Sequence, residues 1–95
     1  MIMFYIHYFV LPEKTVKVLR EGGCSIEAGT ANSAVRSLAE GLRAELKVPR
    51  GRVRITSIDV MERISPDPDG QSRYRVVRSL DPKVECADIA GVIAG

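Results

Sequence analysis

The first part of the chain contains a run of residues that limits which folds are available. Residues 2–11, IMFYIHYFVL, are β-branched, aromatic or otherwise apolar except for His7. This composition is typical of a β-strand, and the lack of polar alternation favours a strand covered on both faces. The run is about half the ~20 apolar residues that a membrane-spanning helix requires, and it has neither a basic leader nor a small-residue cleavage site. We therefore predict a strand in the centre of a sheet.

The next segment predicts a second strand that is antiparallel to the first. Pro12 ends the apolar run, and residues 15–20 alternate partly between apolar and polar, which favours a hairpin. Gly22 and Gly23 then interrupt the pattern before another short segment. Paired glycines in a strand indicate either a tight turn or a bulge, and the sequence leaves both open.

A helix is the clearest element of the pattern. Thr30 or Asn32 can cap its start, and Val48-Pro49 ends it because proline disfavours helical geometry in the residue before it. Its apolar positions recur at intervals of three and four: Ala31, Val35, Leu38, Leu42 and Leu46. Another edge carries the small residues Ser37, Gly41 and Ala44. We interpret this edge either as simple tolerance of a glycine or as a self-association surface in a homodimer.

The second half of the chain predicts two further strands and a tail. Residues 52–64 and 73–78 read as strands joined by a turn that ends in Asp-Gly. In the first of them the apolar phase changes between Ile55 and Ile58, which indicates a bulge near Ser57 or a strand buried on both faces.

The tail from 82 to 95 combines apolar residues with several alanines and predicts a short helix or an apolar segment. We expect it to dock on the open face of the sheet or to belong to an interface with another chain. Together these elements predict a single α+β domain over residues 1–95. Its antiparallel sheet has four to five strands in β-β-α-β-β order, with one main helix packed on one face.

Catalytic, metal and cofactor sites lack their usual residue patterns. His7 is the only histidine, so any histidine triad or histidine metal cluster would depend on it alone. Cys24 and Cys86 do not form a Cys-x-x-Cys pair, so we expect two reduced thiols in a cytoplasmic protein. No glycine-rich phosphate-binding motif is present. We predict a non-enzymatic protein without a metal, a cofactor or a membrane association.

Arginines supply the candidate binding surface. The net charge of +2, from 14 basic and 12 acidic residues, names no partner. The arginines of the two late strands are more informative: Arg52, Arg54, Arg73, Arg75 and Arg78. Residues two apart in a strand project from one face, so the two pairs would form one patch if their faces coincided. Such a patch could hold nucleic-acid phosphates or clamp an acidic protein surface; the alternative is a face that arginine merely keeps soluble.

The order of the elements, and the residues from Arg20-Glu21-Gly22 through Ile26-Glu27-Ala28 to Thr30, Ala34 and Arg36, resemble small phage-encoded proteins, among them type I anti-CRISPR proteins. This resemblance implies a sheet-plus-one-helix inhibitor that binds a surveillance complex and obstructs its DNA path.

The chain is also similar in outline to HicB-type antitoxins, at Gly23-Cys24 and Gly29-Thr30, which implies neutralisation of a toxin. We expect a small inhibitor or adaptor that binds a protein or a protein–nucleic-acid complex. The alternatives are a direct nucleic-acid-binding domain and an antitoxin-like partner of a toxin.

Overall fold

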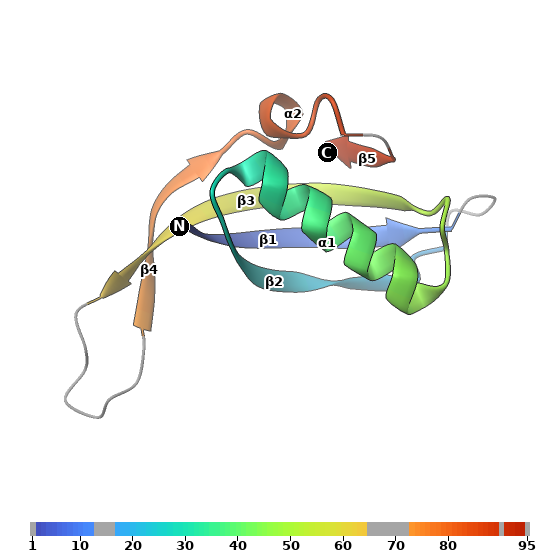
Figure 1. Ribbon diagram of the computed structural model, residues 1–95, viewed down its shortest axis with the longest axis horizontal. Coiled ribbons are helices and arrows are strands. Elements are labelled where there is room, and N and C mark those ends of the chain that lie inside the picture. Colours follow the sequence, from blue (N-terminus) through green and yellow to red (C-terminus); the bar gives the residue numbers. More distant parts are fainter. Residues whose placement is uncertain (1, 13–16, 65–72, 90, 95) are drawn as a thin grey trace.

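The computed structural model describes residues 2–12, 17–64, 73–89 and 91–94, which form one sheet and one main helix (Figure 1). The turn predicted between 65 and 72 lies outside the described residues. The elements in chain order are β1 (Ile2–Leu11), β2 (Arg20–Ala28), α1 (Ala31–Leu46), β3 (Arg52–Ile64), β4 (Arg73–Leu80), α2 (Pro82–Glu85) and β5 (Val92–Ala94).

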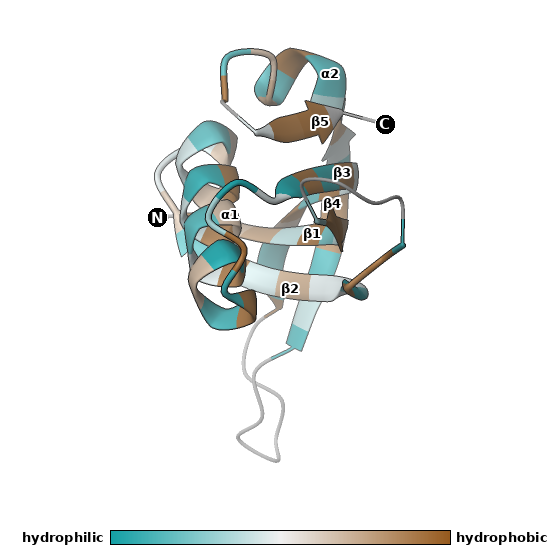
Figure 2. Cartoon of the chain, turned by 90° about the vertical axis from the view of Figure 1, so that its right-hand side faces the viewer, coloured by the Kyte–Doolittle hydropathy of each residue, from teal (hydrophilic) through white to brown (hydrophobic). Residues whose placement is uncertain are grey.

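The sheet places β1 in its interior, between β2 and β3. The strand order is β2-β1-β3-β4 with antiparallel neighbours, and β5 adds a short parallel pairing with β3. In the edge-on view, α1 covers one face of the sheet and no described helix covers the other (Figure 2). The predicted α+β class, the element order and the central first strand are confirmed, and β5 is an additional strand. No helix in the described part of the chain is long and apolar enough to cross a membrane.

The core lies between α1 and one face of the sheet. Alternate residues of β1 are buried there: Phe4, Ile6, Tyr8 and Val10. On the opposite face, which we call the open face, His7 is exposed and the remaining β1 residues are only partly covered. The expectation that β1 is covered on both faces was therefore wrong, because its intervening aromatic residues lie on the open face instead of under a second layer.

α1 follows the predicted pattern closely. Thr30 is the cap, since its Oγ1 accepts a hydrogen bond of 3.1 Å from the backbone N–H of Ser33. The helix ends at Leu46, and the next residue, Lys47, adopts the left-handed conformation with a φ of 57° and so allows the chain to turn away. Four of the five predicted apolar positions are buried, and Leu46 is partly buried.

β2 corrects two expectations. The predicted strand at 15–20 begins only at Arg20; residues 17–19 precede it, and 13–16 lie outside the described part. Gly22 and Gly23 form neither a turn nor a bulge, because they pair with β1 in unbroken register. A Cβ on Gly23 would lie 2.5 Å from the Tyr5 hydroxyl oxygen, so glycine here makes room for a tyrosine ring in a regular strand.

β3 contains a bulge, which was one of the two explanations for its change of phase. Ser57 pairs with His7, and Ile55 pairs with the next β1 residue, which leaves Thr56 as the extra residue. Thr56 and Ser57 both lie outside the core, so the apolar residues before and after them can face α1. Ile55 and Ile58 are both fully buried as a result.

The tail docks at an edge of the sheet and not on its open face, which corrects the expected alternatives. β4 pairs with β3 only from Ile58 onward, so the first half of β3 has a vacant edge that β5 fills. The backbone N–H of Val53 donates to the carbonyl of Gly91 at 2.9 Å. Cys86 and Ile89 of the tail join the core, at 2% and 7% exposure.

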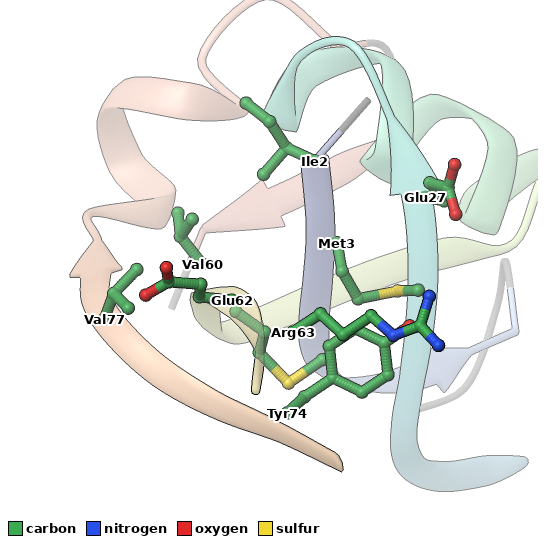
Figure 3. A pocket seen from close by; sticks show the side chains of 9 residues that line it. Ile2, Met3, Glu27, Val60, Glu62, Arg63, Tyr74 and Val77 are labelled. Carbon is green, nitrogen blue, oxygen red and sulfur yellow. The ribbon is translucent and has the colours of Figure 1, made fainter. Parts of the chain in front are cut away.

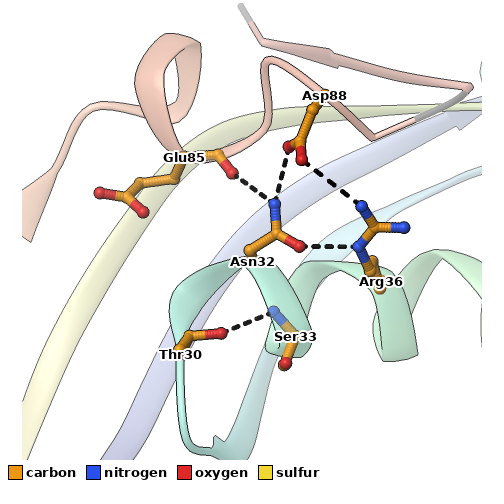
Figure 4. A network of polar contacts seen from close by, with 6 residues as sticks. All are labelled: Thr30, Asn32, Ser33, Arg36, Glu85 and Asp88. Atoms are coloured by element: carbon orange, nitrogen blue, oxygen red, sulfur yellow. Dashed lines mark hydrogen bonds and ion pairs between the residues drawn. The ribbon is translucent and has the colours of Figure 1, made fainter.

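A polar network also fixes the tail to the start of α1 (Figure 4). Asn32 Nδ2 donates to the Glu85 carbonyl at 3.2 Å and to Asp88 Oδ1 at 2.8 Å. Arg36 Nε donates to Asn32 Oδ1 at 2.7 Å, and Arg36 Nη2 lies 3.6 Å from Asp88 Oδ2. The tail is therefore part of the folded unit through apolar, main-chain and side-chain contacts.

Candidate binding surfaces

The structure separates the five candidate arginines into two groups. Arg52 and Arg54 pair with Leu11 and Phe9 of β1, on the open face at the start of β3. Arg73, Arg75 and Arg78 of β4 pair instead with the residues of β3 at 64, 62 and 60.

The two groups differ in both position and face. Glu62, the neighbour of Arg75, lies ten residues along β3 from Arg52, which corresponds to about 33 Å of extended strand. The β4 arginines share the side of Val60, which packs toward α1, whereas Arg52 and Arg54 lie on the open face. The condition for a single four-arginine patch is not met.

The second group lies on a strand pair that extends beyond the N-terminal end of α1 (Figure 1). We call residues 61–64 of β3 and 73–78 of β4 the arm. All of β4 up to residue 79 is exposed, including Tyr74 at 41%, Val76 at 55% and Val77 at 48%. The described arm has four arginines and one carboxylate, Glu62, whose Oε2 lies 3.1 Å from Arg75 Nη2.

A pocket of about 560 Å³ lies at the base of the arm. Its lining includes Met3 of β1, Met61 and Arg63 of β3, and Tyr74 and Val77 of β4. Met3, Arg63 and Tyr74 point toward one another across it (Figure 3). Methionine side chains adapt to differently shaped apolar groups. Glu27 and Glu62 also line the pocket, so it offers charged contacts beside the apolar ones.

The open face carries a row of aromatic rings on β1. The rings of Tyr5 and His7 meet edge to face with centroids 4.8 Å apart. The Arg54 guanidinium carbon lies 5.6 Å from the Phe9 ring centroid, within the range of a cation–π interaction. The adjacent aromatic pairs in the sequence thus divide between the core and the open face.

The predicted self-association edge is exposed. Ser37, Gly41 and Ala44 lie on the outside of α1, and a Cβ built on Gly41 would meet no atom within 4 Å. Two of these residues border a groove of about 400 Å³ between α1 and β2, next to the ion pair of Arg20 with Glu45 at 2.8 Å. No neighbour within the described chain explains the glycine, and self-association through this edge stays a prediction.

The three arginines of β4 were predicted from the sequence, but Arg63 and the apolar residues of β4 were not. Tyr74, Val76 and Val77 were treated as an ordinary partner strand. The signal was present in the segment RYRVVRSL, which combines apolar residues and arginines with no acidic residue. A strand of this kind at a sheet edge offers both apolar contacts and positive charge.

The two cysteines occupy different environments, and neither forms a disulfide. Cys24 is partly exposed on β2, whereas Cys86 is buried. Burial raises the pKa of the Cys86 thiol to about 11, and the negative charges of Glu85 and Asp88 add to the effect. Among the described residues, no group of three His, Cys, Asp or Glu side chains lies close enough together to hold a metal ion.

The raised pKa of Cys86 predicts a loss of stability in alkaline solution. The unfolded thiol, with an ordinary pKa of 9.0, releases its proton before the folded one does. The protonated Cys86 thiol contributes its full share to the free energy of unfolding below pH 9, and this contribution is lost as the pH rises to about 11. A difference of two pKa units corresponds to a loss of about 2 to 3 kcal/mol. Urea unfolding at pH 8 and pH 11 should show this loss in the natural protein and not in Cys86→Ala. Cys24→Ala should retain it, and equal pH dependence in all three would refute the assignment.

No protein family, curated protein or solved structure matches this chain. The resemblances to anti-CRISPR proteins and to antitoxins therefore remain expectations from the sequence. What the chain binds must be inferred from the geometry and charge of its surfaces.

Proposed function

We propose that the protein is a non-catalytic binding protein, a small inhibitor or adaptor, that contacts an acidic protein surface through its arm. The observation that carries this proposal is β4, a strand at the sheet edge that is exposed along nearly its whole length and has three arginines and no acidic residue. The partner is a protein or a protein–nucleic-acid complex. An inhibitor of a surveillance complex and an antitoxin both belong to this class.

The arm fits such a partner better than the open face does, because charge on the open face is balanced. Glu21 and Glu27 of β2 pair with Phe9 and Met3, and Asp59 of β3 pairs with Tyr5. Three carboxylates therefore share this face with three arginines, Arg52, Arg54 and Arg63, whereas Arg73, Arg75 and Arg78 lie on the other side of β4. Asp59 also accepts a hydrogen bond of 2.7 Å from the Ser79 hydroxyl. The open face offers an acidic partner little net attraction.

The arginines of the arm are accessible to carboxylates of a partner. The Arg75–Glu62 ion pair is 66% and 57% exposed at its two side chains, and ion pairs this exposed contribute little to stability. A partner carboxylate can therefore replace or share Glu62 at low cost. Arginine can hold a carboxylate with two parallel hydrogen bonds, and interfaces are enriched in arginine and tyrosine with apolar neighbours. The arm has this composition.

The proposal is tested by charge reversal on the arm. The double variant Arg73→Glu, Arg78→Glu should bind a fluorescent peptide of alternating glutamate and valine at least about tenfold more weakly, a loss of about 1.4 kcal/mol. Binding to the natural protein should weaken as salt is added, because exposed charges are screened. Fluorescence anisotropy measures both effects.

The matched control reverses two charges elsewhere, with Lys47→Glu after α1 and Lys83→Glu on α2, both exposed. It should bind the peptide nearly as well as the natural protein. Equal losses in the two double variants, or no binding of the peptide by the natural protein, would count against the arm.

Direct nucleic-acid binding is the second candidate, and the aromatic row of the open face favours it. Single-stranded nucleic acids bind by stacking bases on exposed aromatic rings beside cations, as Phe9 and Arg54 would allow. Tight binding of generic single strands, with a steep salt dependence and a loss in Phe9→Ala, would support this function in place of the first. We rank nucleic-acid binding second because three carboxylates lie on the same face as the aromatic row.

A further inference from the structure

We propose that the partner supplies an extended segment, with acidic and apolar residues in alternation, which pairs with the outer edge of β4 as an additional strand. This inference rests on the proposed function and specifies the kind of partner that the arm takes. It follows from the main chain, the charge and the side-chain alternation of β4.

The main chain of β4 is available on one side. β3 pairs with one edge of β4, and β4 is the last strand of the sheet in the order β2-β1-β3-β4. In the described part of the chain no strand pairs with its outer edge. Val77 is an extra residue in the β3 pairing, so Arg73–Val76 is the regular stretch, matched to residues 61–64. An exposed strand edge of this kind is a template for an added strand.

Charge selects the occupant of this edge. A second copy of β4 would bring three more arginines and no carboxylate, which is unfavourable in a strand pair. Another edge strand, β2, has Glu21 and Glu27 but also Arg20, and its pairing with β4 of another copy would be a head-to-tail contact that gives a ring or an open-ended chain of molecules. An acidic segment of a different protein would place carboxylates beside the arginines of β4 without either cost.

The alternation of β4 defines the pattern of the segment. Tyr74 and Val76 pair with Arg63 and Met61, on the side where the pocket of about 560 Å³ opens. Arg73 and Arg75 lie on the other side. Residues directly opposite in neighbouring strands share a face, so every second residue of the segment would be apolar, toward Tyr74 and the pocket, and the residues between would be acidic.

The test compares three fluorescent peptides that contain the same numbers of glutamate and valine residues. One alternates glutamate and valine, one carries N-methyl groups on alternate residues of that sequence, and one groups all glutamates before all valines. The alternating peptide should bind at least about tenfold more tightly than the other two, since N-methylation removes main-chain donors and grouping removes the side-chain match. Backbone hydrogen exchange of β4 should slow when the alternating peptide binds.

The outcomes separate this inference from the proposed function. Equal affinity for all three peptides, lost in Arg73→Glu, Arg78→Glu, would leave the arm as a charged contact surface and overturn strand addition. Unchanged hydrogen exchange in β4 at saturating peptide would also overturn it. If the arginine variant binds all three peptides as well as the natural protein does, the proposed function fails together with the inference. If the arm binds nucleic acid in preference to the peptides, its occupant is a nucleic acid and not a protein segment.

Discussion

Replacing Ile89 by aspartate should lower the free energy of unfolding by about 3 to 5 kcal/mol, because it removes a buried aliphatic side chain and puts a charge in its place. Ile89 belongs to the tail and is 7% exposed, in the same core cluster as Cys86. If the tail undocks instead of burying the charge, the protein loses the contacts of Cys86 and of β5 as well. Urea or thermal unfolding measures the loss.

Val84→Asp is the matched control, since Val84 is also in the tail region but is 70% exposed on α2. Its free energy of unfolding should stay within about 0.5 kcal/mol of the natural value, as is usual for exposed positions. Similar effects at both positions would show that the tail contributes little to the core. A large effect at Ile89 alone establishes that the last residues complete the fold.

The parts of the fold that were predictable from the sequence are those fixed by local patterns. α1 follows from a cap at Thr30, an apolar repeat of three and four residues, and Pro49 after its end. The bulge in β3 follows from the change of phase between Ile55 and Ile58, because side chains of a strand alternate with a strict period of two. At these positions the residues close in sequence were sufficient to predict the local structure.

The position of the tail could not be predicted in this way. β5 pairs with residues 53–55 of β3, roughly forty residues earlier in the chain, and it takes that place because β4 leaves the first half of β3 unpaired. The glycines of β2 are a similar case. Gly23 is explained by the Tyr5 ring on the neighbouring strand, and no feature of its own segment distinguishes this role from a turn.

The separation of the candidate arginines was implied by the sequence and was overlooked. When 52–64 and 73–78 form one hairpin, the start of the second strand must lie beside the end of the first. Arg73 therefore lies next to Ile64, far from Arg52 and Arg54. Side-chain alternation fixes the face of each arginine pair, but the pairing of the hairpin fixes how far along it each pair lies.

Deleting Arg54 should lower the free energy of unfolding by about 3 kcal/mol or more, because the deletion reverses the alternation of β3 on one side of the gap. Val53, fully buried beside β5, would turn to the open face and Arg52 would turn into the core. The loss of a buried valine costs about 2 kcal/mol, and burial of an arginine without a partner adds to this cost. If the bulge closes to absorb the change, Ile55 is lost from the core in place of Val53.

Deletion of Thr56 in the same strand is the control, and it should cost no more than about 1 kcal/mol. Thr56 is the extra residue of the bulge, so its removal leaves Val53, Ile55, Ile58 and Val60 in regular alternation on the α1 side. The deletion forfeits only the exposed hydrogen bond of 3.3 Å from Thr56 Oγ1 to the His7 carbonyl. Urea unfolding compares the two deletions directly. If both deletions destabilise the protein equally, the bulge is required for the fold. If only the deletion of Arg54 lowers the free energy of unfolding strongly, the fold requires the alternation of β3 but not the bulge itself.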